Sequence, residues 1–284
     1  MASCSANPSI NWLIHSDCNT DIRRPPNVRL VNISWKHYQE RISDTLGLRY
    51  SPITPLSICD LRPAFGRIYE TEIRNFDYFG WGDIDVIYGD IRNFYDEAVL
   101  STNAISADPN ICSGHLMLLK NEEWLRDAFR LIPGWRSKLE RPEPGEWRDC
   151  LDEAHLSGIL SSNAQARGEF RSSGEAPVPS LYWDNNYFKD QWVTPFVPKL
   201  WHDGRWDHPE RWYWRKGRMM DDRHATRHYL YLHLMNFKAK RYVNEHLYAD
   251  SATWDSLTTK VEFGPWPDSI SEMFISRAGV CTSP

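Results

Sequence analysis

The sequence predicts an α/β fold in which helices sandwich a mixed sheet, and two patterns in residues 1–165 carry this prediction. Short apolar runs typical of strands alternate with segments whose apolar residues recur at helical spacing. Glycine and proline residues separate these segments, as in chains that alternate strands with helices. With 284 residues, 41% of them hydrophobic, the chain is long enough to bury a full core.

The N-terminal elements follow in order. Residues 10–15 form an apolar run that ends before a Ser-Asp pair, and residues 28–33 alternate after two prolines, so we expect two strands. A helix should run from Ser34, its N-cap, to a stop at Gly47. Residues 58–73 carry apolar side chains three and four positions apart, which predicts a further helix.

Residues 78–90 change from an aromatic, glycine-rich stretch to alternating acidic and apolar residues, which indicates a strand end followed by a turn. On a regular strand Asp83 and Asp85 would point to opposite faces, so they can meet at one cation only if the chain bends there. Gly82 and Gly89 allow such a bend. A divalent cation held there could bridge the two phosphates of a nucleotide-sugar, although a bare acidic pair is more often a solvated turn.

The rest of the chain continues the alternation and then becomes rich in tryptophan. We expect helices at 91–100, at 121–131 and from 147, strands at 104–107 and 115–119, a loop at 165–179, a hairpin at 212–217, and a helical or irregular segment at 225–242. Residues 1–165 would form the core, and residues 166–284 a second segment packed on it as one domain.

Composition excludes several classes of protein. The net charge of −5 and the pI near 6.1 argue against a nucleic-acid or membrane-surface partner and favour a small or neutral ligand. No apolar stretch approaches the ~20 residues that span a bilayer, and no secretory leader is apparent. The six cysteines lack a CxxC pair, which favours reduced thiols and a cytoplasmic location.

Two motifs stand out: C-D-L-R-P-A-F-G at residues 59–66 and G-W-G-D-I-D-V-I-Y-G-D at residues 80–90. They resemble motifs of small bacterial glycosyltransferases of the GT-A type, whose specificity is largely uncharacterised, and the resemblance extends more loosely over residues 7–240. It implies a GT-A (Rossmann-like) fold, a nucleotide-diphosphate-sugar donor, Mn²⁺ or Mg²⁺, and a hydroxyl acceptor in a polysaccharide, glycolipid or natural product. Such proteins usually open with a strand, a loop and a helix before the segment that resembles residues 4–8, so either the start of this sequence is misassigned or trimmed, or the first nucleotide-binding strand is missing here.

The resemblance also implies roles for single residues. Asp83 and Asp85 look like the residues that hold the metal and the donor, with Asp60 and Arg62 flanking the donor and Asp17 near the nucleotide. His233 resembles a histidine that completes the metal shell, and Lys238 a lysine that touches the diphosphate. Either Asp152 or Glu153 would deprotonate the acceptor hydroxyl.

Each of these roles has a structural alternative. Acidic residues such as Asp152 and Glu153 also stabilise the start of a helix, and a lone histidine beside Leu and Tyr is more often buried in a core, with His228 a weaker rival ligand. The segment from Ser113 to His115 is either a backbone that faces the acceptor or an ordinary tight turn. Six tryptophans either form an acceptor platform or pack the core: Trp183, Trp192, Trp201, Trp206, Trp212 and Trp214.

Two other functions fit the same residues. A non-catalytic carbohydrate-binding protein would use tryptophan faces for sugars and the acidic motif for a structural Ca²⁺. A metal-dependent phosphotransferase or nucleotidyltransferase would use the same aspartates, but the sequence has no glycine-rich P-loop or basic cluster that favours it.

Overall fold

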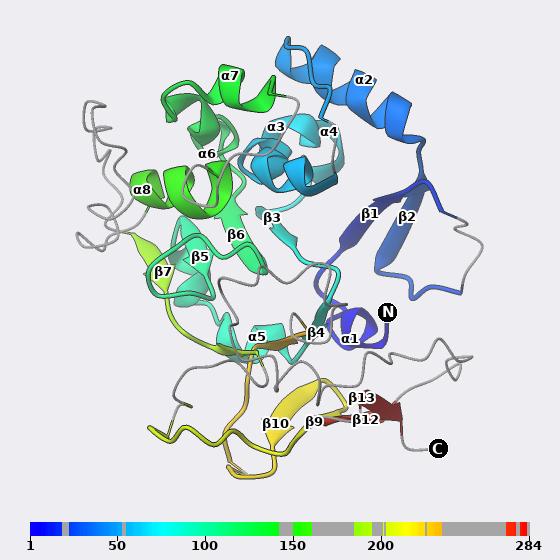
Figure 1. Cartoon of the computed structure of the whole chain (residues 1–284), viewed down its shortest axis with the longest axis vertical. Helices are drawn as coiled ribbons and strands as arrows, with labels where there is room; N and C mark the ends of the chain where they lie inside the picture. The colour runs from blue at the N-terminus through cyan, green and yellow to red at the C-terminus, as the bar shows by residue number, and fades with distance from the viewer. Residues whose placement is uncertain are drawn as a thin grey trace.

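The computed structural model describes residues 1–18, 23–52, 55–141, 150–160, 185–194, 201, 203–224, 226–234, 271–276 and 279–282. The protein is a mixed α/β structure in which short helices pack against several small sheets (Figure 1). The α/β prediction is confirmed at this level. Within the described ranges no helix is long and apolar enough to cross a membrane.

The N-terminal part contains a parallel strand pair followed by a helix. Its elements are α1 (Ala2–Ser5), β1 (Trp12–Ser16), β2 (Val28–Asn32) and α2 (Trp35–Leu46). The Ser34 hydroxyl accepts the backbone N–H of His37, and Gly47 ends α2 with φ of 63°. Both strands and the helix with its caps are confirmed. Asn7 fixes this part to the turn after residue 88, because its amide donates to Gly89 O at 2.8 Å.

The expected helix over residues 58–73 is wrong, since this segment is divided into η1 (Pro55–Ala64), α3 (Phe65–Ile68) and α4 (Glu70–Ile73). Pro63 lies inside η1, and a proline lacks the N–H of a regular helix and clashes with the preceding turn. Gly66 then packs so closely on Phe79 that a Cβ would lie 2.5 Å from its ring. A 3₁₀ segment of 10 residues and two single helical turns therefore replace one long helix.

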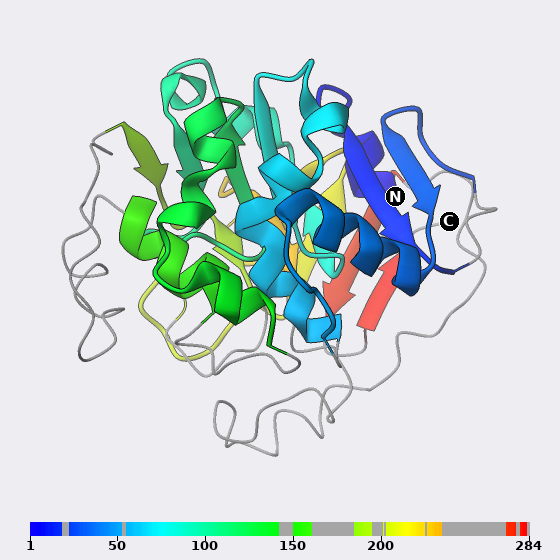
Figure 2. The ribbon, with the colours of Figure 1, turned by 90° about the horizontal axis from the view of Figure 1, so that it is seen from above.

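A second sheet has the order β3-β6-β5-β7, antiparallel except for the parallel pair β5–β7. Its strands are β3 (Tyr78–Gly82), β6 (Leu116–Lys120), β5 (Ala104–Ser106) and β7 (Asn186–Phe188). Figure 2 shows the blue and green helices on one side of these strands. Phe79, Trp81, Met117 and Leu119 of the sheet pack there with buried residues of the helical segments in one core.

Several short helical segments surround this sheet. They are α5 (Ile91–Phe94), η2 (Val99–Ser101), α6 (Glu123–Arg126), η3 (Ala128–Leu131), α7 (Trp135–Leu139), the π-helix η5 (Leu151–Leu156) and α8 (Ser157–Leu160). The predicted helices over 91–100 and 121–131 are thus each divided into two parts, and the predicted strands over 104–107 and 115–119 are confirmed within a residue or two.

Two further sheets use the chain after residue 185. One has the order β4-β11-β8, with β4 (Val86–Tyr88), β11 (Tyr231–His233) and β8 (Trp192–Val193). The other has the order β10-β9-β12-β13, with β9 (Arg211–Arg215), β10 (Arg218–Asp221), β12 (Glu272–Ser276) and β13 (Gly279–Thr282). Because β11 pairs with β4 and β7 pairs with β5, these later strands are hydrogen-bonded to strands from the first half of the chain.

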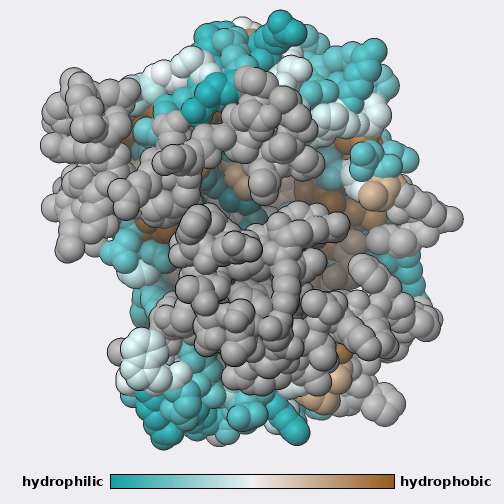
Figure 3. Space-filling view, viewed as in Figure 1, coloured by the Kyte–Doolittle hydropathy of each residue, from teal (hydrophilic) through white to brown (hydrophobic). Residues whose placement is uncertain are grey.

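The predicted hairpin is confirmed as β9–β10, whose connecting residues Lys216 and Gly217 have φ of 47° and 84°. The expectation of a helical or irregular segment at 225–242 is wrong at residues 231–233, which form the buried strand β11 between β4 and β8, whereas residues 226–230 belong to no helix or named strand. Residues 161–184, which hold the predicted loop and the boundary at 165, lie outside the described residues. On the face shown in Figure 3 the coloured surface is mostly hydrophilic at the top and bottom, and hydrophobic colour gathers between.

Candidate metal centre

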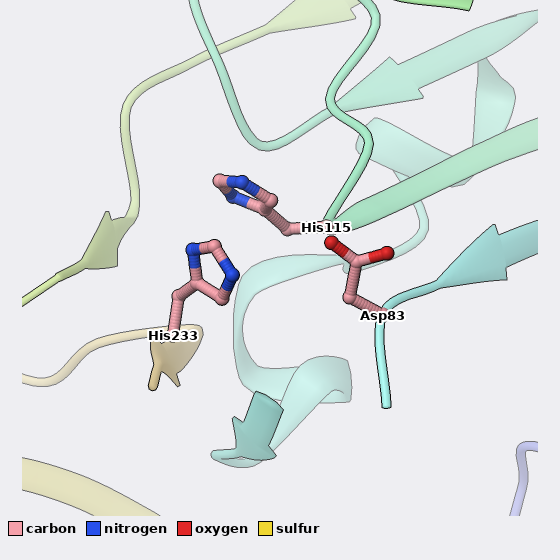
Figure 4. A group of neighbouring side chains, drawn as sticks. All are labelled: Asp83, His115 and His233. Atoms are coloured by element: carbon pink, nitrogen blue, oxygen red, sulfur yellow. The ribbon is translucent and has the colours of Figure 1, made fainter. Parts of the chain in front are cut away.

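Asp83, His115 and His233 come together although they lie far apart in the sequence (Figure 4). Each offers one possible ligand atom, and these atoms all lie within 4.8 Å of one another. Asp83 directly follows β3, His115 directly precedes β6, and His233 ends β11. The group therefore lies where the sheet of β3 and β6 meets the sheet of β4 and β11.

Strand pairing explains this meeting. Gly82 of β3 pairs with Leu116 of β6, and the N–H of Asp83 donates to His115 O at 3.1 Å, so these two residues are neighbours. The chain then turns at Ile84 and Asp85 and enters β4, whose Val86 pairs with His233. The predicted bend between the aspartates is confirmed, and it is the point at which the chain leaves one sheet for another.

Asp85 lies beside this group. Its Oδ2 is 3.2 Å from Nε2 of His233, and its backbone O accepts the N–H of Leu234 at 2.8 Å. Ile84, between the two aspartates, is 93% exposed, so the tip of the turn faces outward. The two acidic residues of the motif therefore lie together at this site: Asp83 is a member of the group, and Asp85 contacts its His233.

The donor chemistry suits a cation. His233 is 2% exposed, and its Nδ1 has no hydrogen-bond partner among the described residues. Such a buried polar atom is costly unless something binds it. Carboxylate and imidazole ligands together fit Mn²⁺ and its first-row neighbours, whereas Mg²⁺ and Ca²⁺ prefer oxygen ligands alone.

A layer of charged side chains, formed by Arg62 and Asp152, lies next to Asp83 on the side of the protein interior. The Arg62 guanidinium pairs with the Asp83 carboxylate and, at 2.7 Å, with Asp152 Oδ2. Burial would lower the pKa of Arg62, but the carboxylates of Asp152 and Asp83 outweigh burial and raise it, so the side chain stays cationic. Arg62 therefore holds the Asp83 carboxylate from the side of the protein interior.

Gly114 brings this layer close to His115. Its N–H donates to Glu153 Oε1 at 3.1 Å, and a Cβ at this position would lie 2.6 Å from Arg62 Nη1 and 2.7 Å from Glu153 Oε1. The sequence left open whether this glycine lets an acceptor approach the backbone or belongs to an ordinary tight turn. The close approach is made instead by two side chains of the protein itself.

Aromatic rings form a wall beside the two histidines. The ring centroids of His115 and His233 are 3.9 Å apart, and the Trp192 ring lies 4.6 Å from that of His115 in an edge-on arrangement. The Tyr231 ring stacks on Trp192 at 5.9 Å and lies 6.0 Å from the His115 ring. The imidazoles are thus held by packing as well as by the strands.

The tryptophans predicted as an acceptor platform divide by location. Trp201, Trp212 and Trp214 are buried in a core beneath β9 and β12, as the core alternative expected, and Trp206 is 73% exposed. Trp192 lies at the histidine pair. Trp183 is outside the described residues.

The other predicted site residues have different surroundings. Asp60 is buried and its Oδ1 accepts the N–H of Leu151 at 2.9 Å, so it holds the start of η5. The Asp152 side chain is 2% exposed, whereas Glu153 is half-buried. Asp17 is exposed after β1, His228 is not part of the three-residue group, and Lys238 lies outside the described residues.

The sequence interpretation missed His115. It considered the segment 113–115 for its backbone alone, because the antiparallel pairing that places His115 beside Asp83 joins β3 to a strand more than thirty residues later. The signal that could have found it is a histidine directly before a predicted strand that pairs with the strand ahead of the acidic motif.

Comparisons with curated proteins and with solved structures gave no match. Residues 1–255 match a family described as "Family of unknown function (DUF6625)", which covers most of the 284 residues. The chain therefore belongs to the DUF6625 family.

Proposed function

We propose that this protein is a metal-dependent glycosyltransferase that moves a sugar from a nucleotide-diphosphate-sugar to a hydroxyl acceptor. The observation that carries the proposal is the group formed by Asp83, His115 and His233, next to Asp85. Carboxylates from an acidic turn and imidazoles from two other strand ends are a donor set for a divalent cation. The resemblance of residues 59–66 and 80–90 to GT-A glycosyltransferase motifs supports the same chemistry.

The residues that would hold the cation are Asp83, His115 and His233, with Asp85 beside them. When bound, the cation supplies positive charge that stabilises a diphosphate leaving group. We propose Mn²⁺ in preference to Mg²⁺, because imidazole nitrogen suits Mn²⁺ better. Arg62 keeps the Asp83 carboxylate in place from behind.

We assign proton abstraction from the acceptor hydroxyl to Glu153. Of the two acidic residues in η5, Asp152 is 2% exposed and paired with Arg62, which leaves it unsuited to meet an acceptor. Glu153 is half-buried, and Gly114 N–H fixes its Oε1 one residue before His115. The Glu153 carboxylate therefore lies among the charged side chains next to the candidate metal centre, where a general base could act.

We also propose that the α/β core has the GT-A arrangement, with the donor at the turn after β3. The parallel pair β1–β2, the strand β3 that leads into the acidic turn, and the later strands β8 and β11 that complete the centre support this reading. The six cysteines are unpaired, which supports a reducing compartment, the cytoplasm, as the site of action.

A non-catalytic carbohydrate-binding protein with structural Ca²⁺ is less well supported. Ca²⁺ sites are built from oxygen ligands, and two of the three side chains in this group are imidazoles. Trp201, Trp212 and Trp214, which such a protein would present to sugars, are buried.

The proposal is tested by thermal unfolding with UDP, GDP, CDP or dTDP, or their sugar conjugates, each with and without Mn²⁺. A ligand that binds the native state raises the unfolding temperature, so we expect a Mn²⁺-dependent rise with one nucleotide. Asp83→Asn should abolish this rise. Asp77→Asn, the same substitution at an exposed aspartate before β3, should keep it. A well-folded wild-type protein that responds to none of the nucleotides would refute the proposal.

A further inference from the structure

A short chain of polar groups leads from the core to His115. The Ser113 hydroxyl lies 3.2 Å from the Tyr231 hydroxyl, which in turn lies 3.3 Å from Nδ1 of His115. Tyr231 is fully buried in β11, and its ring stacks on Trp192 at an interplanar angle of 17°. The Tyr231 hydroxyl is therefore fixed both by its strand and by its neighbours.

This contact bears on which nitrogen of His115 would bind a cation. A neutral imidazole carries its proton on one nitrogen and a lone pair on the other, and a metal needs the lone pair. Tyr231 contacts Nδ1, so a cation held together with Asp83 and His233 would use Nε2 of His115. Histidine ligands of metals commonly have their other ring nitrogen held in this way.

We propose that Tyr231 is a positioning residue for the metal centre. Its hydroxyl oxygen accepts the Nδ1–H of His115 and its own proton goes to Ser113, which keeps Nε2 of His115 unprotonated. The inference rests on the proposed metal centre and does not depend on which sugar is transferred, or on sugar transfer at all. It adds a residue that touches no substrate.

The surroundings of Tyr231 suit this direction of hydrogen bonding. The Ser113 oxygen is an acceptor within reach, and it also accepts the N–H of His115 at 3.2 Å. In the opposite arrangement Tyr231 would donate to Nδ1, and His115 would carry its proton on Nε2, where it blocks a metal.

The experiment measures the tautomer and the metal affinity separately. Metal-free protein with ¹⁵N-labelled histidine is examined by long-range ¹H–¹⁵N NMR at a pH where the imidazoles are neutral, and the His115 signals are identified by their loss in His115→Asn. We expect the Nδ1–H tautomer in the wild-type protein and a shift toward Nε2–H in Tyr231→Phe. Mn²⁺ titration followed by EPR should show that Tyr231→Phe weakens binding by about 10- to 100-fold, as for other partners of metal-bound histidines.

Tyr95→Phe is the matched control. Tyr95 is fully buried in the same core as Tyr231, and its hydroxyl has no hydrogen-bond partner among the described residues. The same loss of a buried hydroxyl should there leave both the His115 tautomer and the Mn²⁺ affinity unchanged. A fall in Mn²⁺ affinity that Tyr95→Phe shares would assign the effect to core packing and overturn the proposal.

Two other results would also overturn the positioning role: an Nε2–H tautomer in the wild-type protein, or wild-type Mn²⁺ affinity in Tyr231→Phe. A protein that binds Mn²⁺ with the expected tautomer but binds no nucleotide would refute sugar transfer and still support the role of Tyr231. A wild-type protein that binds no Mn²⁺ would overturn both proposals.

Discussion

Two adjacent acidic residues, Asp152 and Glu153, have different environments in η5, and the difference predicts different mutant behaviour. Asp152 is buried in an ion pair with Arg62, so Asp152→Ala leaves a buried charge with one partner fewer. Breaking a buried pair costs about 3–5 kcal/mol, and we expect the free energy of unfolding in urea to fall by an amount of that order. An Asp152→Ala protein with wild-type stability would show that the pair is not stabilising.

Glu153→Gln should lower turnover and leave stability nearly unchanged, whereas Asp152→Ala should lower stability. The amide keeps an oxygen that can accept the Gly114 N–H, so stability should change little. It cannot take a proton, and loss of a general base lowers turnover by about 10²- to 10⁴-fold. Single-turnover rates at saturating Mn²⁺ measure this, and unchanged rates would remove Glu153 from the mechanism.

Asp85→Asn should remove turnover while the fold is kept. Asp85 lies in the turn directly before β4, 3.2 Å from His233 Nε2, so its charge should matter more for cation binding than for core packing. Replacing a carboxylate by an amide weakens a divalent-cation site. The circular dichroism spectrum should match that of the wild type, and activity at saturating Mn²⁺ equal to the wild type would contradict the assignment.

His15 predicts a dependence of stability on pH. Burial, and then the charge of Arg41, lower the pKa of His15, so the folded protein holds this imidazole neutral while the unfolded chain protonates it below about pH 6.5. Because the unfolded state then binds more protons, stability falls as the pH falls from about 7 to 5. His15→Phe keeps the ring beside Tyr69 and should make this fall smaller in urea denaturation.

Among the helices and strands, features set by neighbouring residues in the sequence were predicted correctly, whereas features set by the packing of distant segments were not. Ser34 and Gly47 delimit α2 through hydrogen bonding and a left-handed φ that the residue types themselves favour. The strand β11 has three residues and exists because β4 and β8 flank it, which no pattern within 225–242 shows. His115 was missed for the same reason, since its place depends on the pairing of β3 with β6.

The N-cap of α2 gives a prediction at this scale. Ser34 is exposed and its side chain accepts the His37 N–H at 3.3 Å, so Ser34→Ala should remove one hydrogen bond and little packing. Loss of such a cap costs about 1 kcal/mol, and a change to glycine costs a few tenths. Urea denaturation of Ser34→Ala and Ser34→Gly should give this order, and equal stability of the two variants would contradict it.

For the whole molecule, the candidate centre joins parts of the chain that belong to different sheets. Asp83 and His115 lie at the ends of β3 and β6, whereas His233 comes from β11 and Asp85 lies directly before β4. Residues of β3 and β6 pack in one core, whereas residues of β4 and β11 belong to two others, one of which also includes Leu116 of β6. A cation held by both sheets would therefore link regions that are otherwise joined by packing and by the acidic turn.

This arrangement predicts that Mn²⁺ stabilises the whole protein. An ion that binds the folded state alone adds about 2.7 kcal/mol at 100 times its Kd, and the chelator EDTA should reverse the gain. His233→Ala should lose the gain, because it removes the ligand contributed by β11. The control is His37→Ala, at an exposed histidine in α2, which should respond to Mn²⁺ like the wild type. If His233→Ala is stabilised as much as the wild type, Mn²⁺ binds elsewhere, and the two sheets are held together without it.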